Sequence, residues 1–588
     1  MPRRFALPVL LALAALLLLA TGGRPAAAGG SRPAPCWLLD SPQLAYVSGG
    51  GHALLRQQCG AAQTGARPGA AAQPSSPAAV PARAAASASA GPPTGFGSDV
   101  RANDPAADEP PHTTQSEATV APCGRTVLAA WNDSGGPNLT GYGRSGNGGA
   151  TWADLGAIPG FTGSDPVLAA DNDCRFYFSA ITFVGGCGAI GVARSDDGGW
   201  TWGPVASASP GTPCANFQDK QGIAVDRTPG PSAGNVYACW DDRGRSEIRV
   251  LFSRSLDGGR TFSEPVTLSS FAFGFATGCQ VGVRPGGDVF AVWTQGDTLS
   301  LNMRRSVDAG NSFGPEVRIT GTVSLAPFKF CGPNEIRPVL NGDIRSFNWP
   351  SFAVNPLTGS LHVAWNDSRS GDPDVLYARS GDGLIWDAPV RLNDDATETD
   401  QFQPALAFTE GGLLRVIWYD RRLDPEANLM IDVYSATSQD DGETFSANER
   451  ITDVSFGVPP LNPNFDSRLF ACYMGDYVGI AGANGVHYMA WGDNRNIVEG
   501  HPDPDIYFER RSTAHLGDVD CDLDTDAGDA LGVLRALGGL GPPGACLHSG
   551  GDTNCDGATT ALDAVAILDF LAGARPPPRA PGCPEVGV

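Results

Sequence analysis

The sequence predicts an all-β protein made of repeated sheets, and three observations support this fold class. Gly 76 and Pro 48 together make 124 of 588 residues, about 21%, which is typical of many short strands joined by turns. From Phe96 to about Ser512, an apolar strand that often ends in Trp recurs, followed by an acidic or amide turn and a second strand ending in Ser or Thr. A glycine-rich octet then closes most of these units.

The octets share Ser at the first position, Asp or Asn at the third and an aromatic residue at the last. They occupy residues 145–152, 195–202, 255–262, 306–313 and 438–445, with a shortened member at 380–386. This series resembles the Asp-box (BNR) repeat of sialidases and related β-propellers. The octets start 50, 60, 51, 74 and 58 residues apart, and a period of about 50 residues suits one four-stranded blade.

The acidic residue of each octet is predicted to hold a turn. A carboxylate or amide at the third position can accept hydrogen bonds from nearby backbone N–H groups, and glycine supplies the positive φ that a tight turn requires. We therefore expect a structural rather than a catalytic role for the octet aspartates, Asp197, Asp257, Asp308 and Asp440.

The number of blades follows from the strand pairs that carry the Trp, which occur seven times. They centre on Trp131, Ile181, Trp240, Trp293, Trp365, Trp418 and Trp491. No octet follows the seventh pair, whereas residues 96–104 read like the strand at 386–394. We therefore predict a seven-bladed Asp-box β-propeller whose first strand completes the last blade, which removes exposed sheet edges. A six-bladed propeller is the runner-up, because the resemblance to sialidases implies six blades.

Charge and the N-terminal residues limit the function and location. The chain has 40 Lys and Arg residues and 63 Asp and Glu residues, which gives a net charge of −23. This charge excludes a protein that binds nucleic acid through its phosphates. Residues 1–28 read as a signal peptide, with Arg3 and Arg4 before the apolar run Phe5–Ala20. A membrane anchor is the rival interpretation, but this run is short of the roughly 20 residues that a span needs. We expect a secreted, extracellular or cell-surface-associated protein with no membrane span in the mature chain, in which the 14 cysteines form disulfides.

The rest of the chain divides by composition. Residues 29–60 form a short segment in which Cys36 and Cys59 could pair, and residues 61–95 are an Ala/Pro/Ser-rich linker. The predicted propeller covers residues 96–513. A small second domain covers 516–573, and a Pro-rich tail covers 574–588.

The second domain contains two acidic loops 34 residues apart. Their oxygen-bearing side chains stand at positions 1, 3, 5 and 12, where Ca²⁺ would find its ligands: Asp518, Asp520, Asp522 and Asp529 in the first loop, and Asp552, Asn554, Asp556 and Asp563 in the second. Each loop leads into an apolar helical stretch, Ala530–Leu537 or Ala564–Leu571. The pair resembles the repeats of type I dockerin domains, which implies a small α-helical calcium-loop domain.

This resemblance implies a cohesin-like or cell-surface partner. Ala527-Gly528 and Ala561-Leu562 occupy the positions at which hydroxyl residues often contact a cohesin. In the first loop Leu523 replaces the usual glycine, so we expect the first calcium site to be the weaker one. The symmetry of the loops favours the disulfides Cys521–Cys546 and Cys555–Cys583.

Two kinds of position on the propeller are candidates for a site. The motif W-x-D, often with Arg two residues further on, recurs in most blades and is predicted to cap turns and form salt bridges. Two long insertions, Thr320–Asn348 and Thr452–Asp476, are expected to rise over the opposite face from the octets, and one pairing open to them is Cys331–Cys472. Residues entering the innermost strands are expected to point toward the central channel: Asp165, Asp219, Lys220, Trp349, Gln401, Asp476 and Tyr477.

The resemblance to sialidases implies three arginines that clamp a carboxylate, a Tyr–Glu nucleophile pair and an Asp acid/base. The early Arg-Ile-Pro motif of that family is absent here. The candidates for an analogous catalytic set are Asp476, Tyr477, Tyr473, Glu335, Asp219, Arg337, Arg345 and Arg468.

The sequence therefore leaves two functions open. One is a secreted carbohydrate-active protein, a sialidase-like exo-glycosidase that acts on a glycan or glycoconjugate and is attached through its calcium-binding domain. The alternative is a non-catalytic extracellular propeller that binds a glycan or protein in adhesion.

Overall fold

The computed structural model describes most of the chain. The described residues are 35–41, 44, 47, 49–60 and 99–512, without 109, 271–273, 297–298, 333–334, 459–465, 467–471 and 499. In the C-terminal part they are 517–519, 525–540, 547, 551–554, 558–574 and 586. The predicted signal peptide, the whole predicted linker, and the disulfides predicted for Cys521, Cys546, Cys555 and Cys583 lie outside these residues.

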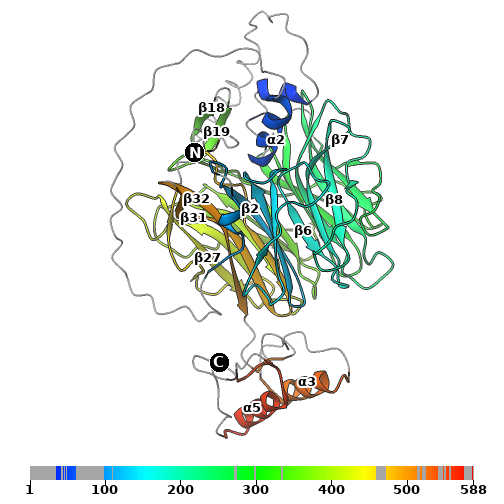
Figure 1. Ribbon diagram of the computed structural model, residues 1–588, viewed down its shortest axis with the longest axis vertical. Helices are drawn as coiled ribbons and strands as arrows, with labels where there is room; N and C mark the ends of the chain where they lie inside the picture. Colours follow the sequence, from blue (N-terminus) through cyan, green and yellow to red (C-terminus); the bar gives the residue numbers. More distant parts are fainter. Residues whose placement is uncertain are drawn as a thin grey trace, which may run out of the picture.

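Seven antiparallel sheets have four strands each on their main path, and in six of them the strands follow one another in chain order. Figure 1 shows how the sheets are arranged. The first three are β2 (Gln115–Cys123), β3 (Thr126–Asp133), β4 (Thr140–Ser145), β5 (Ala153–Asp154); β6 (Val167–Ala170), β7 (Phe176–Val184), β8 (Cys187–Ser195), β9 (Ala206–Ser207); and β10 (Phe217–Val225), β11 (Val236–Arg243), β12 (Ile248–Ser255), β13 (Val266–Thr267). The next three are β14 (Ala276–Val283), β15 (Val289–Gln295), β16 (Ser300–Ser306), β17 (Val317–Gly321); β21 (Ser351–Val354), β22 (Leu361–Asp367), β23 (Asp374–Ser380), β24 (Val390–Arg391); and β25 (Gln401–Phe408), β26 (Leu414–Asp420), β27 (Met430–Ser438), β28 (Glu449–Arg450). A short strand, β29 (Phe456–Gly457), also pairs with β27.

The last sheet joins the two ends of this region. It orders β30 (Gly479–Ala483), β31 (Val486–Val498), β32 (His501–Ser512) and β1 (Val100–Arg101). Val100 lies opposite Phe508 and Arg101 opposite Tyr507, which confirms the predicted closing strand. The innermost strands neighbour one another in the order β2, β6, β10, β14, β21, β25 and β30, and β30 packs against β2 again. The sheets therefore form a closed ring, the arrangement of a β-propeller.

Buried Trp side chains anchor the second strand of most sheets. Trp131, Trp240, Trp293, Trp365, Trp418 and Trp491 are almost fully buried. The indole N–H of Trp418 donates to Asp420 at 2.8 Å, and Arg422 forms an ion pair with the same carboxylate at 2.8 Å. Asp367 and Asp493 make the same two contacts, so three of the W-x-D acids cap turns and pair with arginine.

The octets form turns stabilised by their own side chains. Asp257 Oδ1 accepts hydrogen bonds from the backbone N–H groups of Arg260 and Thr261, at 3.0 and 2.9 Å. The hydroxyl of Ser255 accepts the N–H of Gly259, which has a φ of 80°. Burial raises the pKa of Asp257, but the hydrogen bonds to its carboxylate, led by that of the Thr261 hydroxyl, together outweigh burial and lower the pKa to about 2.

We expect Asp257→Ala to destabilise the protein by about 1–2 kcal/mol, because several hydrogen bonds to one charged group are lost. Chemical denaturation of the variant measures this change. Asp196→Ala, which removes an exposed acid at the second position of another octet, serves as control and should stay within about 0.5 kcal/mol of the wild type. A loss of function without a loss of stability in Asp257→Ala would contradict the structural role.

An insertion between β17 and β21 carries a hairpin over one end of the ring. It contains β18 (Phe328–Gly332), β19 (Glu335–Leu340) and β20 (Ile344–Arg345). The disulfide Cys331–Cys472 joins it to the second long insertion, which confirms that pairing. The N-terminal segment lies beside this hairpin, with η1 (Cys36–Asp40) and α2 (Gly49–Gly60) closed by Cys36–Cys59 (Figure 1). Three further disulfides are Cys123–Cys174, Cys187–Cys214 and Cys239–Cys279, and such frequent pairing is typical of extracellular proteins.

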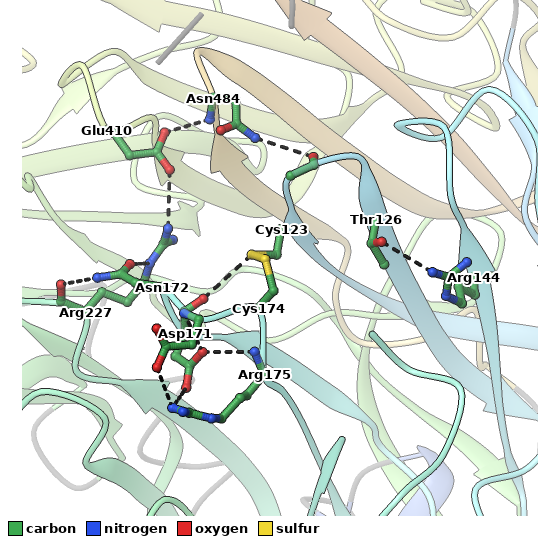
Figure 2. The surroundings of a disulfide bond; sticks show 12 residues. Cys123, Thr126, Arg144, Asp171, Asn172, Cys174, Arg175, Arg227, Glu410 and Asn484 are labelled. Carbon is green, nitrogen blue, oxygen red and sulfur yellow. Dashed lines mark hydrogen bonds and ion pairs between the residues drawn. A yellow bond between two sulfur atoms is a disulfide. The ribbon is translucent and has the colours of Figure 1, made fainter. Parts of the chain in front are cut away.

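The opposite end of the innermost strands is bridged by polar side chains (Figure 2). Arg227, which follows β10, forms an ion pair with Glu410, which follows β25, at 3.3 Å. Glu410 also accepts the backbone N–H of Asn484 at 2.8 Å, and Arg227 donates to Asn172 at 2.9 Å. The strands β10 and β25 belong to sheets that are not neighbours in the ring, so these contacts reach across its axis.

Burial keeps His487 on β31 neutral in the folded protein. Burial, with a contribution from Arg415, lowers the pKa of His487 to about 3, and its imidazole contacts the carbonyl of Ala407 at 3.2 Å. The pKa of an unfolded histidine is about 6.5. The stabilising contribution is therefore complete above pH of about 6.5 and is lost as the pH falls toward 3.

We expect the wild type to lose up to about 1.4 kcal/mol of stability per pH unit below pH of about 6 from this one group. His487→Gln should show a shallower loss between pH 6 and 4, because glutamine does not titrate. Urea midpoints across this range measure both proteins. Parallel curves would contradict the assignment to His487.

The C-terminal part contains two capped helices, α3 (Ala527–Leu537) and α5 (Ala561–Leu571), which pack together. Asp526 and Thr560 are their N-caps, each in a capping box with an acid at the third helical position. A small core of Val519, Val533 and Ile567 lies between them. The predicted helical stretches after both acidic loops are thus confirmed. No helix of the described residues is long and apolar enough to cross a membrane.

Candidate functional site

The innermost strands share an irregularity at the end of the ring nearest the hairpin. β2, β10, β14 and β25 each contain a bulge near their first residues. Within these strands, and just before β6, the backbone adopts positive φ, which only glycine adopts readily. The residues and their φ values are Glu117 57°, Asp165 58°, Lys220 52°, Gly278 73° and Gln403 51°. Non-glycine residues in this conformation cost about 1 kcal/mol or more each and concentrate at functional sites, so the bulges mark a candidate site.

Two cations hold one carboxylate at its centre. Lys220 Nζ lies 2.5 Å from Asp476 Oδ2, and Arg345 Nε donates to Asp476 Oδ1 at 2.6 Å. Arg345 Nη2 also binds Asp476 Oδ2, so the guanidinium contact is bidentate. Burial alone would raise the pKa of Asp476, but Arg345 and Lys220 outweigh burial and lower it. Asp476 is therefore ionised in the folded protein.

The pKa of a second carboxyl group in the same cluster is shifted in the opposite direction. Burial, followed by repulsion from Asp165, raises the pKa of Glu117 well above its usual range. Its Oε2 accepts a hydrogen bond from Asn132 at 2.9 Å, and its Oε1 lies 4.0 Å from Arg345 Nη2. Asn132 also donates to Asp165 Oδ1 at 3.2 Å, which ties the two acids together. Burial and the neighbouring acid therefore favour the protonated form of Glu117.

Aromatic side chains surround these charges. Lys220 lies over the ring of Trp349 at 4.3 Å and over that of Tyr477 at 5.2 Å. The Tyr473 hydroxyl is 2.8 Å from Ser116 Oγ and 3.3 Å from Asn132 Nδ2. Burial and the nearby Glu117 raise the pKa of both tyrosines well above 10, so both are neutral.

The other predicted site residues lie in different surroundings. Asp219 pairs with Arg243 at 2.9 Å, and Arg243 pairs in turn with Asp241. Burial raises the pKa of Asp241 to about 7, although Arg243 opposes this. Asp219 also accepts the backbone N–H of Lys220 at 2.9 Å, so it supports the bulge. Gln401 accepts a hydrogen bond from Asn393 and belongs to the rim of its own sheet.

Arg337 and Arg345 meet at one backbone carbonyl. Both guanidinium groups are fully buried and donate to the oxygen of Val47, at 3.3 and 3.0 Å. The side chain of Glu335 and the whole of Arg468 lie outside the described residues. The structure thus brings together Asp476, Tyr473, Tyr477, Arg345 and Arg337 of the predicted set.

Sequence reasoning missed Glu117 and Asn132. Glu117 stands at the same place in β2 as Lys220 does in β10, and Asp165 precedes β6 in the same way. Aligning the starts of the innermost strands, in addition to the octets, would have singled it out. The W-x-D motif could not single out Asn132, because Asn132 is the middle residue of that motif in the first sheet and the motif leaves this position open.

The acidic loops of the C-terminal domain are described only in part, since Asp520, Asp522 and Asp556 lie outside the described residues. Asp563 is fully buried and accepts the backbone N–H groups of Thr553 and Thr560, at 2.8 and 2.7 Å. Asp529 accepts those of Val519 and Asp526 in the same way. No cluster of three metal-binding side chains is assembled among the described residues. Residues 517–574 contain ten aspartates and one arginine, so buried Asp518, Asp529 and Asp563 suit a cation.

The chain was compared with known proteins. No protein-family model matches it, and no curated protein matches it. Among solved structures, it resembles a PL25 polysaccharide lyase (ulvan lyase) with a TM-score of 0.41 and 11% identity, over 68% of this chain and 97% of the lyase. The Penicillium chrysogenum α-L-arabinanase gives 0.37 and 12%, over 71% and 98%. A Hadza microbial sialidase gives 0.35 and 14%, over 64% and 74%. Similarities with such low TM-scores do not indicate a function, so the function proposed below is based on the residues of the site.

Proposed function

We propose that this protein is a secreted carbohydrate-active enzyme, a sialidase-like exo-glycosidase on a seven-bladed propeller. One observation supports the proposal most. A single buried cluster contains Glu117, whose pKa is raised by burial, and Asp476, whose pKa is lowered by Arg345 and Lys220. Carboxyl groups with pKa values driven apart in one site suit general acid catalysis beside a fixed negative charge.

Each residue of the cluster then has a separate role in the reaction. Glu117 gives its proton to the leaving oxygen as the glycosidic C–O bond breaks. The ionised Asp476 stabilises the positive charge that develops at the anomeric carbon. Its ion pairs with Lys220 and Arg345 weaken this stabilisation. Water adds at that carbon and returns a proton to Glu117. Asn132 is a positioning residue, because it orients Glu117 through the 2.9 Å hydrogen bond.

The test is turnover by the mature protein on a panel of fluorogenic exo-glycosides, sialoside included, with calcium present. Both the intact chain and a chain cut within residues 61–95 are assayed, because residues 35–60 cover the site. Hydrolysis of one class of glycoside by either form supports an enzyme. A folded protein that hydrolyses no member in either form would reject the proposal.

The second candidate is a non-catalytic binding propeller. Complete burial favours it, because Lys220, Asp476 and Arg345 are paired with one another and nearly inaccessible. Such a protein would bind a glycan or protein on the same face without turnover. Calorimetric binding that does not change with Glu117→Gln would favour this candidate.

The C-terminal domain is proposed to hold Ca²⁺ and to attach the enzyme to a cohesin-like or cell-surface partner. Asp518, Asp520, Asp522 and Asp529 would hold one ion, and Asp552, Asn554, Asp556 and Asp563 the other. Calcium would supply the positive charge that one arginine cannot provide to ten aspartates.

We expect chelation to lower the stability of this domain and its helical circular dichroism, and Asp563→Ala to weaken the calcium response about tenfold or more. Titration of the chelated full-length protein with CaCl₂, followed by calorimetry, measures this. Asp569→Ala, late in α5, is the control and should titrate like the wild type. Equal titrations for all three proteins would contradict the second site.

A further inference from the structure

The N-terminal segment, residues 35–60, cannot form a core by itself. Leu38, Val47, Leu54 and Leu55 are fully buried, although the segment has only two short helices and one disulfide. These side chains belong to the same apolar cluster as Ile181, Phe217 and Trp240 of the ring, among others. The segment therefore buries its apolar side against the second and third sheets.

Polar contacts fix the segment at the same place. The indole N–H of Trp37 donates to the carbonyl of Ala215 at 2.6 Å, and the guanidinium of Arg245 stacks over the Trp37 ring at 5.3 Å. Both partners lie in or beside the loops at the end of the ring that carries the hairpin. Arg245 itself is exposed, so this stacking lies at the rim of the docked segment.

The segment also reaches the charged cluster. The carbonyl of Val47 accepts hydrogen bonds from Arg337 and Arg345, and Arg345 is the residue that holds Asp476. Buried guanidinium groups need acceptors, and a main-chain carbonyl takes the place that water or a ligand oxygen would occupy. While Val47 is in place, both arginines are inaccessible.

We propose that this face is a docking surface whose occupant is residues 35–60 of the same chain, and that the docked segment is an intramolecular inhibitor of ligand access. The segment is tethered to the ring through residues 61–98, and a tether of this kind supplies an effective concentration on the order of mM. Cutting the tether removes this high effective concentration, so we expect the segment to dissociate from the ring on dilution. The inhibitory role concerns the site of the proposed function, but docking can be measured without turnover.

The experiment uses the mature chain with a site-specific protease sequence placed within residues 61–95, folded first and cut afterwards. Size-exclusion chromatography and mass spectrometry follow whether residues 35–60 leave the ring on dilution to nanomolar concentration. Phenylglyoxal, which modifies accessible arginine, reports whether Arg337 and Arg345 become exposed. We expect release together with at least tenfold faster modification of both arginines.

A point variant tests the same contact in the uncut chain. Arg245→Glu removes the stacking on Trp37 and should speed modification of Arg337 and Arg345 about two- to fivefold. Arg249→Glu is the matched control, because Arg249 is exposed on the adjacent strand and pairs with Glu247 instead. It should leave the modification rate unchanged.

Each outcome decides the proposal. A segment that stays bound after cutting and dilution, with both arginines still protected, would overturn it and make residues 35–60 a permanent part of the fold. Release that leaves an existing glycosidase activity unchanged would overturn the inhibitory role. Release with exposed arginines but no turnover on any glycoside would support docking and reject only the enzyme.

Discussion

Glu117→Gln is expected to lower kcat about 10²–10⁴-fold in the form of the protein that shows turnover. Glutamine keeps an oxygen for the hydrogen bond from Asn132 but has no proton to give to a leaving group. The raised pKa of Glu117 keeps the wild-type group protonated, so activity should fall only as the pH rises through that pKa. This alkaline decline should be absent from any residual activity of the variant.

Glu443→Gln is the control for Glu117→Gln, since Glu443 is an exposed acid of an octet and pairs with Arg379. Its kcat and pH profile should match the wild type. A Glu117→Gln protein with undiminished kcat would remove the proton donor from the mechanism and leave Asp165 or Tyr473 as the group to test next.

Asp476→Asn is expected to destabilise the protein by about 3–5 kcal/mol. The substitution leaves the buried cations Lys220 and Arg345 without their shared counter-ion, and an uncompensated buried charge is costly. Lys220→Met together with Asp476→Asn should recover part of the loss, because one of the two stranded cations is then gone. Chemical denaturation of the wild type, both single variants and the double variant gives the coupling.

The matched control is Asp343→Asn, which breaks the exposed ion pair between Lys329 and Asp343. An exposed pair contributes less than about 1 kcal/mol, so the loss should be small. If Asp476→Asn cost no more than this control, then the central cluster would not be held together by its charges.

Local sequence was sufficient to predict the elements that recur. An octet contains its own hydrogen-bond acceptors and glycines, and W-x-D places a carboxylate next to its indole, so both turns could be read from a few residues. The pairing of Val100 with Phe508 was also predictable, because the fourth strand missing from the seventh unit had a likeness at residues 96–104. Cys331–Cys472, which the structure contains, was one pairing open to two insertions expected on one face.

The site depended on contacts that no local pattern records. Glu117 becomes an acid of the cluster only because a bulge in β2 turns it toward Asp165 and Arg345, which come from other sheets. Val47 meets Arg337 although the two are 290 residues apart. The proposed role of residues 35–60 could not be read from the sequence, because it depends on the surface of the ring against which they pack.

The bridge between Arg227 and Glu410 at the far end of the ring has a kinetic consequence. Side chains join strands across the axis there, so we expect a ligand to reach the cluster from the hairpin end, where residues 35–60 are docked. For the proposed enzyme, product would then leave from the end at which substrate binds, and we expect it to act as a competitive inhibitor.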